Sequence, residues 1–127
     1  MTPEFLAWIV QNWVRCEEYI QRAVDRTNGA VSIDYVWNQV IGGGAQFWPG
    51  AHGAVVTKIE QHPSGMNVAL GWLAGGDDMD ELKDIEARIS KWAKDMGCAR
   101  FEIIGRRGWL RALKGYREGD TLLVKDL

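Results

Sequence analysis

The sequence predicts a single α/β domain of the α+β type, in which a mixed, mostly antiparallel central sheet is flanked by helices. The length of 127 residues suits one domain spanning residues 1–127. Two stretches with apolar residues at helical spacing come before any strand-like stretch, which predicts two N-terminal helices. A hairpin pattern then leads into alternating helical and strand-like stretches, and this order produces a mixed sheet with helices packed on it.

The two N-terminal helices are predicted over residues 3–25 and 33–41. Thr2 and Ser32 are good N-cap residues, and Pro3 suits the first helical position. The glycine run 42–44 ends the second helix. The expected buried stripe of the first helix consists of Phe5, Ile9, Trp13, Cys16, Ile20 and Val24. That of the second consists of Ile33, Val36, Trp37, Val40 and Ile41.

Three strands are expected next, over residues 46–48, 54–61 and 66–74. The second alternates in its residue types, and the third has the mostly apolar run of a central strand. The Pro-Ser-Gly turn at 63–65 joins these two as an antiparallel hairpin.

The remaining chain predicts a helix over 78–96, a strand over 99–104, a short helix over 107–114 and a strand over 121–125. Asp78 is the expected N-cap of the long helix, and Glu81 stands three residues later, as in a capping box. Gly97 is the expected C-terminal stop. The expected buried face of this helix consists of Leu82, Ile85, Ile89, Trp92 and Met96.

The charge is unevenly distributed although the formal net charge is only -2. Residues 77–86 hold six acidic residues and one lysine, whereas residues 100–117 hold six basic residues and one acid. The two cysteines fit no metal-ligand spacing, so we expect no metal site. No apolar run approaches the roughly 20 residues of a membrane span, and the N-terminus lacks the basic region of a signal peptide, so we expect a cytoplasmic protein without membrane contact.

The segment from residue 55 to the C-terminus resembles the GNAT superfamily of N-acetyltransferases. There a hairpin leads through a glycine turn into an amphipathic helix, followed by strand, short helix and strand. The closest local match is LRALKGYRE at residues 110–118, which is similar to the family segment LYEKLGFRE. The family's first strand is not evident, so either it is missing or the two N-terminal helices replace it.

The resemblance implies an acetyl-CoA site at Leu73, Ala74, Gly75 and Gly76. The family holds the cofactor's pyrophosphate there on an RxxGxG loop at the start of the central helix, through backbone N–H groups. This chain instead places four carboxylates within residues 77–81. Each would repel a phosphate by on the order of 1 kcal/mol or more near a surface. The acids equally suit a helix N-terminus with no ligand, so the cofactor is either acetyl-CoA or none.

Glu60, Glu102 and Tyr116 are the candidate catalytic residues if the chain is an acetyltransferase. The family base is often a glutamate on a strand, and both glutamates are on predicted strands. Tyr116 is a candidate acid, because Arg111 occupies the position of the family's tyrosine and arginine is a poor proton donor. Solvated strand glutamates and a packing tyrosine are the alternatives.

The sequence also resembles small proteins encoded by tailed bacteriophages and prophages. The similar stretches are AQFWP at 45–49, LAGG at 73–76 and GRRGW at 105–109. This resemblance implies a viral protein in the host cytoplasm or in the virion.

The basic 100–117 segment provides the candidate partner-binding residues Arg106, Arg107, Trp109, Arg111 and Lys114. Arginines interleaved with an aromatic residue can pair with an acidic protein surface, including residues 77–86 of a second copy, or can bind nucleic acid. The leading hypothesis is therefore a phage-encoded GNAT-like protein with a degenerate acetyl-CoA site that binds a virion, host or identical protein. The alternatives are an active acetyl-CoA-dependent N-acetyltransferase and, less favoured, a nucleic-acid-associated protein.

Overall fold

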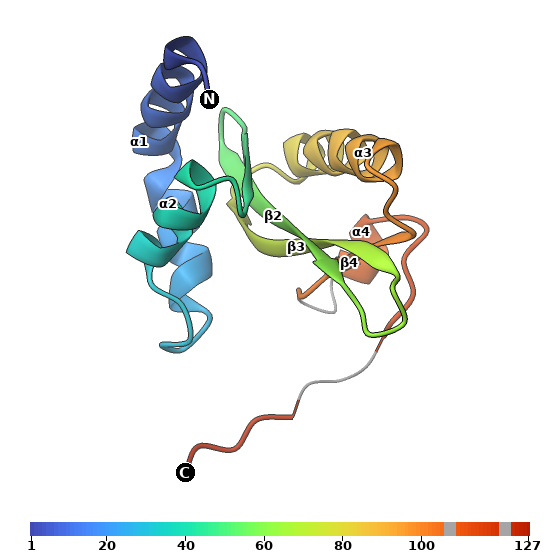
Figure 1. Cartoon of the computed structure of the whole chain (residues 1–127). Coiled ribbons are helices and arrows are strands. Elements are labelled where there is room, and N and C mark those ends of the chain that lie inside the picture. The colour runs from blue at the N-terminus through green and yellow to red at the C-terminus, as the bar shows by residue number, and fades with distance from the viewer. Residues whose placement is uncertain (106–108, 120–122) are drawn as a thin grey trace.

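The computed structural model describes residues 1–105, 109–119 and 123–127 (Figure 1). The elements in chain order are α1 (Pro3–Asp25), α2 (Ile33–Ile41), β1 (Gln46–Pro49), β2 (Gly53–Gln61), β3 (Asn67–Gly76), α3 (Met79–Asp95), β4 (Arg100–Ile103) and α4 (Trp109–Ala112). No helix among these residues is long and apolar enough to cross a membrane.

The four described strands form one sheet in the order β1-β2-β3-β4. The pairs β1–β2 and β2–β3 are antiparallel, whereas β3 and β4 are parallel and are connected through α3. This confirms the predicted mixed, mostly antiparallel sheet. The parallel pairing ends where Gly71 faces Ile103, so residues 72–76 of β3 continue beyond the last residue paired with β4.

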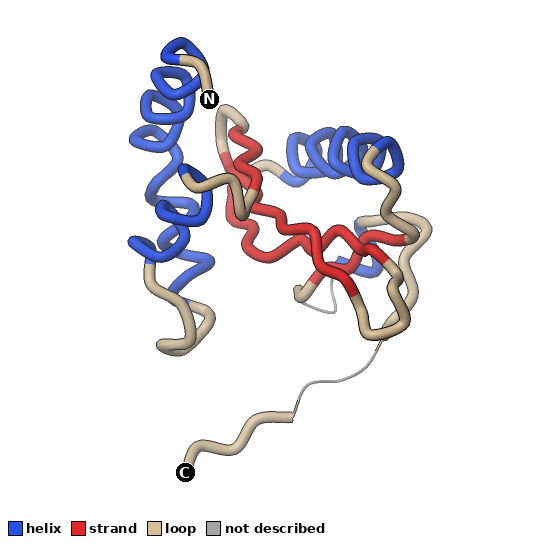
Figure 2. The backbone as a smooth tube through the Cα atoms, in the orientation of Figure 1, coloured by secondary structure: helices blue, strands red, loops and turns tan. Residues whose placement is uncertain are grey.

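Helices cover both faces of the sheet (Figure 2). One core lies under α1 and α2 and contains Val56 and Leu73 from the strands. The other lies under α3 and contains Val55, with Ala74 packed against it. Neighbouring residues of one strand point to opposite faces, and this alternation divides β2 and β3 between the two cores.

The predicted helix starts are confirmed. The side chains of Thr2, Ser32 and Asp78 each accept a hydrogen bond from the backbone N–H three residues later. Gly97 follows the end of α3 with a φ of 84°, the left-handed conformation that glycine adopts at low cost. The capping box is wrong in one respect, since the Glu81 carboxylate bonds to the turn between β1 and β2 instead of to its own helix.

Three other expectations differ from the structure. Phe5 and Met96 are exposed rather than buried, because each is near a helix end, outside the part of the helix that forms the core. Residues 123–125 of the predicted last strand form no strand, and 121–122 lie outside the described residues. Of the helix predicted over 107–114, residues 109–112 are helical and 107–108 are outside the described part.

Candidate functional site

A cavity of about 180 Å³ lies at the C-terminal end of β3, where the strand leads into α3. It has polar and apolar walls and is formed by three elements and the residue that begins α4. Its lining residues are Arg22 of α1 and the C-cap residue Arg26, Ala74, Gly75 and Gly76 of β3, Met79 and Leu82 of α3, and Trp109. Three of the four predicted cofactor residues thus line one cavity, whereas Leu73 is buried in the core on the α1 side.

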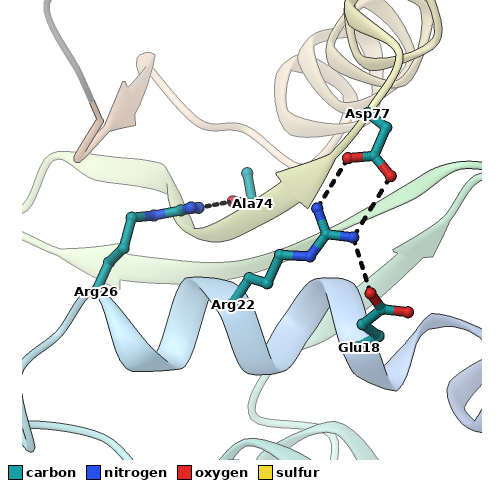
Figure 3. Close-up of polar contacts among 5 residues, drawn as sticks. All are labelled: Glu18, Arg22, Arg26, Ala74 and Asp77. Carbon is teal, nitrogen blue, oxygen red and sulfur yellow. Dashed lines mark hydrogen bonds and ion pairs between the residues drawn. The ribbon is translucent and has the colours of Figure 1, made fainter.

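Two arginines, Arg22 in the last turn of α1 and Arg26 at its C-cap, point toward this end of β3 (Figure 3). The Arg26 Nη2 donates to the carbonyl oxygen of Ala74 at 2.7 Å. The Arg22 guanidinium binds both carboxylate oxygens of Asp77, at 2.8 and 3.4 Å, and also binds Glu18 at 3.1 Å. The arginines are one helical turn apart, so a single face of α1 brings both to the cavity.

These contacts change the charge expected at the glycine turn. The Arg22 hydrogen bond holds the pKa of Asp77 below its usual value, and bonds to Asp77 and Glu18 raise the pKa of Arg22. Asp77 therefore stays ionised and paired at neutral pH. One of the four carboxylates at residues 77–81 is compensated by a cation from a distant part of the chain.

Several polar groups near the start of α3 are engaged by the protein itself. The Asp78 carboxylate accepts the Glu81 N–H at 3.2 Å, and the Asp77 N–H donates to the His52 carbonyl at 2.9 Å. The Glu81 carboxylate accepts the N–H groups of Ala51 and His52, each at 3.0 Å. Asp78 and Glu81 thus serve as a cap and as a clamp on the turn between β1 and β2.

The missing Cβ of each of the two glycines allows another part of the protein backbone to approach closely. A Cβ on Gly75 would fall on the carbonyl oxygen of Tyr19 in α1, and a Cβ on Gly76 would lie 3.0 Å from Gly53 Cα and from the His52 carbonyl oxygen. Backbone packing between α1, β2 and β3 therefore explains both glycines.

The two candidate glutamates lie away from the cavity. Glu60 is exposed near the end of β2. Glu102, on β4, binds His62 Nε2 at 3.2 Å and Arg100 Nε at 2.8 Å. The hydrogen bond to His62 is the main reason why the pKa of Glu102 is lowered. Glu102 thus forms part of an ion-pair cluster with the turn between β2 and β3.

Tyr116 lies on the opposite face of the sheet from Glu102. Its ring packs against Phe101, which belongs to the core under α3, and successive strand residues point to opposite faces. The Tyr116 hydroxyl donates to Glu86 Oε1 at 2.8 Å, and burial raises the pKa of this phenol. The structure therefore does not bring the three predicted catalytic residues together.

The basic segment is only partly described. Arg106 and Arg107 lie outside the described residues, Trp109 is half-buried, and Arg111 and Lys114 are exposed. Arg100 is paired with Glu102. Partner binding by this segment stays a prediction, and binding to nucleic acid would be recognised by a steep loss of affinity with salt.

The sequence interpretation missed Arg22 and Arg26. Their spacing indicated a shared helix face, but no sequence signal indicates which strand that face meets. Their contacts with Asp77 and Ala74 join residues about 50 positions apart, so only the packing of α1 on the sheet assigns them to this site.

Comparisons with known proteins identify the fold. No protein-family model and no curated protein matches the chain. The solved structure of TTHA1254 from Thermus thermophilus is similar with a TM-score of 0.60 at 14% identity, over 92% of this chain and 91% of that chain. A point mutant of that protein gives 0.61 at 13% identity, with the same coverage.

A protein described as a probable acetyltransferase is also similar, with a TM-score of 0.58 at 12% identity, over 100% of this chain and 97% of that chain. These identities establish shared architecture rather than shared activity. The α+β order, the four-stranded mixed sheet and the flanking helices agree with the expectation from the sequence. The chain therefore has a GNAT-like fold.

Proposed function

We propose that this GNAT-like domain binds protein rather than acetyl-CoA. In this proposal, the segment that holds the cofactor in the family serves here only to connect β3 to α3. The start of α3 carries the proposal. A pyrophosphate needs free backbone N–H groups at a helix N-terminus. Here the Glu81 N–H already donates to the Asp78 side chain, and the Asp77 N–H donates to the His52 carbonyl.

The charges around this helix start also support the proposal. The chain also places the acidic side chains of Asp78, Asp80 and Glu81 there, and each carboxylate would repel a nearby phosphate by about 1 kcal/mol or more. Arg22 could attract a phosphate, but it is engaged by Asp77 and Glu18. An incoming pyrophosphate would have to displace these contacts.

The separation of the candidate catalytic groups favours the same conclusion. Glu102 and Tyr116 lie on opposite faces of the sheet, and each is held by its own partners. A general acid and a general base must both reach the reacting atoms. This arrangement supports a binding role over amine acetylation.

The protein-binding half of the proposal is supported by exposed aromatic residues. Phe5 and Trp8 of α1 are about half-exposed and stack on each other. Aromatic residues exposed in this way are typical of protein interfaces. With the phage resemblance of the sequence, we place the domain in the host cytoplasm or the virion, bound to a phage, host or identical protein. Mass spectrometry of purified virions tests the virion location.

Calorimetric titration with acetyl-CoA and with CoA, at low and moderate salt, tests the loss of the cofactor site. We expect no saturable binding up to about 1 mM ligand, which corresponds to a binding free energy weaker than about -4 kcal/mol. Micromolar binding that Arg26→Ala weakens at least tenfold would overturn the proposal. Arg88→Ala is the matched control, because Arg88 is on α3 and pairs with Asp84.

The second candidate function is acetyl-CoA-dependent N-acetylation. It is favoured by the cavity in which Gly75 and Gly76 meet two arginines. A peptide and small-amine acetylation screen tests it, with Tyr116→Phe and Glu102→Gln as variants. Turnover that either variant reduces tenfold or more would establish this second function.

A further inference from the structure

The strand β4 lies at an edge of the sheet. Among the described residues it pairs with β3 alone, so every second residue of its other side presents backbone N–H and C=O groups to no neighbouring strand. The next residue, Ile104, is 70% exposed. An edge of this kind accepts an extended segment that continues the sheet by one strand.

This edge has an apolar face and a charged face. Phe101 and Ile103 point to the α3 side, where both line an apolar cavity. Arg100 and Glu102 point to the other side and bind each other at 2.8 Å. The two charges compensate each other, so the edge lacks the net charge by which edge strands commonly prevent pairing.

The C-terminal tail, which we define as residues 123–127, has the residue types of a strand but forms none in the described part of the chain. Its apolar residues Leu123, Val124 and Leu127 are 88%, 77% and 114% exposed. Figure 1 shows the tail extending away from the sheet and ending far from β4. Burial of these side chains on another surface would be favourable.

We propose that the C-terminal tail of a second copy pairs with the β4 edge, and that two copies exchange their tails about a two-fold axis. Each copy carries one tail and one open edge, so the exchange occupies both edges and both tails and closes the assembly. The position of the tail away from its own β4 favours pairing with another copy. The inference rests on the proposed protein-binding function and deepens it by naming the partner.

One antiparallel register brings compatible side chains together across the two strands. With Lys125 opposite Glu102, opposite charges meet on the charged face. Val124 then lies opposite Ile103 on the apolar face. The remaining pairs of this register are Leu123 with Ile104, Asp126 with Phe101 and Leu127 with Arg100.

The exchanged area is sufficient for a stable dimer. An extended chain exposes about 1.45 Å² per dalton, which gives roughly 800 Å² for the five residues of the tail. If docking covers about half of this area and an equal area of the edge, two tails bury on the order of 1,500 Å² in total. Specific interfaces bury about 1,200–2,000 Å².

Disulfide trapping between copies tests the proposal. Leu123→Cys and Ile104→Cys are made separately in a Cys98→Ser background, and one of the two variants carries ¹⁵N. Directly opposite residues have Cβ atoms about 4.5–5.5 Å apart, close to the span of a disulfide. After mixing and oxidation we expect a covalent heterodimer, at least ten times as abundant as with Val14→Cys in place of Ile104→Cys. Val14 is the matched control, because it lies on α1 and is 69% exposed.

Sedimentation velocity of the full chain without engineered cysteines provides a second measurement, from about 1 µM to about 1 mM protein. We expect a monomer–dimer equilibrium that Val124→Asp weakens at least tenfold, because it sets a carboxylate against Ile103. Asp126→Ala should not weaken the dimer, since this carboxylate faces Phe101 in the same register. Circular dichroism of the variants verifies that they fold.

A heterodimer no more abundant than in the Val14→Cys control overturns the proposal, as does a wild-type chain that stays monomeric over this range. A double variant, Leu123→Cys with Ile104→Cys, that forms its disulfide within one chain also overturns it, because the tail would then pair with its own edge. Binding of acetyl-CoA by the trapped dimer would contradict the proposed function alone. The two proposals can therefore fail separately.

Discussion

The Arg22 Nη1 lies 2.8 Å from Asp77 Oδ1, although the two residues are 55 positions apart in the chain. This ion pair joins α1 to the segment between β3 and α3. It compensates one of the four carboxylates at residues 77–81.

Replacing Arg22 with Gln is expected to raise the pKa of Asp77 toward its ordinary value. The Arg22 hydrogen bond is the main cause of the lowered pKa, and glutamine keeps a donor without the charge. NMR titration of the side-chain carboxyl measures the change. In Arg88→Gln, which removes an arginine from α3, the Asp77 pKa should not move.

The loss of Glu102 is expected to make stability less dependent on pH in the acid range. A lowered pKa in the folded state stabilises the fold above the unfolded value of about 4.3, and this contribution disappears as the pH falls through the folded value. Glu102→Gln should therefore be less stable than the wild type at pH 7, with the difference shrinking below about pH 4.

Urea unfolding at a series of pH values measures this difference. Glu60→Gln is the control, because Glu60 is an exposed glutamate of β2 and is not a partner in the ion pairs of Glu102 with His62 and Arg100. A difference between wild type and Glu102→Gln that is constant from neutral pH to about pH 3 would contradict the electrostatic explanation.

Glu81→Ala is expected to lower the free energy of unfolding by about 2 kcal/mol, because hydrogen bonds to a charged acceptor contribute about 1.5–3 kcal/mol and these are exposed. The carboxylate fixes the turn between β1 and β2 through the N–H groups of Ala51 and His52. Asp80→Ala, in the same helical turn, should cost no more than about 1 kcal/mol from the helix dipole. If both variants lost the same free energy of unfolding, the proposed role of Glu81 in fixing this turn would be wrong.

Gly75→Ala is expected to destabilise the fold by roughly 1–3 kcal/mol, since the added methyl group forces backbone atoms apart. The new Cβ would meet the Tyr19 carbonyl of α1, which cannot move without the helix. In Gly119→Ala the new Cβ would meet nothing within 4 Å. Thermal unfolding of both proteins provides the comparison, and a fully stable Gly75→Ala would show that α1 packs differently.

The structure confirmed the parts of the prediction that depend on local sequence. Thr2, Ser32 and Asp78 cap helices in the expected places, because an N-cap hydrogen bond spans only three residues. The hairpin and the two helix faces follow from spacing that a short window contains. The failure at Phe5 has a different origin, since helical spacing gives the direction of a side chain but not the length of the sheet below it.

By itself, therefore, the sequence determined the order of the elements, the mixed sheet and the positions of the helix starts. Tertiary structure alone decided which groups meet at the end of β3. Arg22 binds the Asp77 carboxylate, and Arg26 donates to the Ala74 carbonyl. The Glu81 carboxylate accepts the His52 N–H instead of bonding to its own helix. It also separated Glu102 from Tyr116 on opposite faces. Such contacts depend on the packing of α1 and α3 against the sheet, which no local pattern of residues specifies.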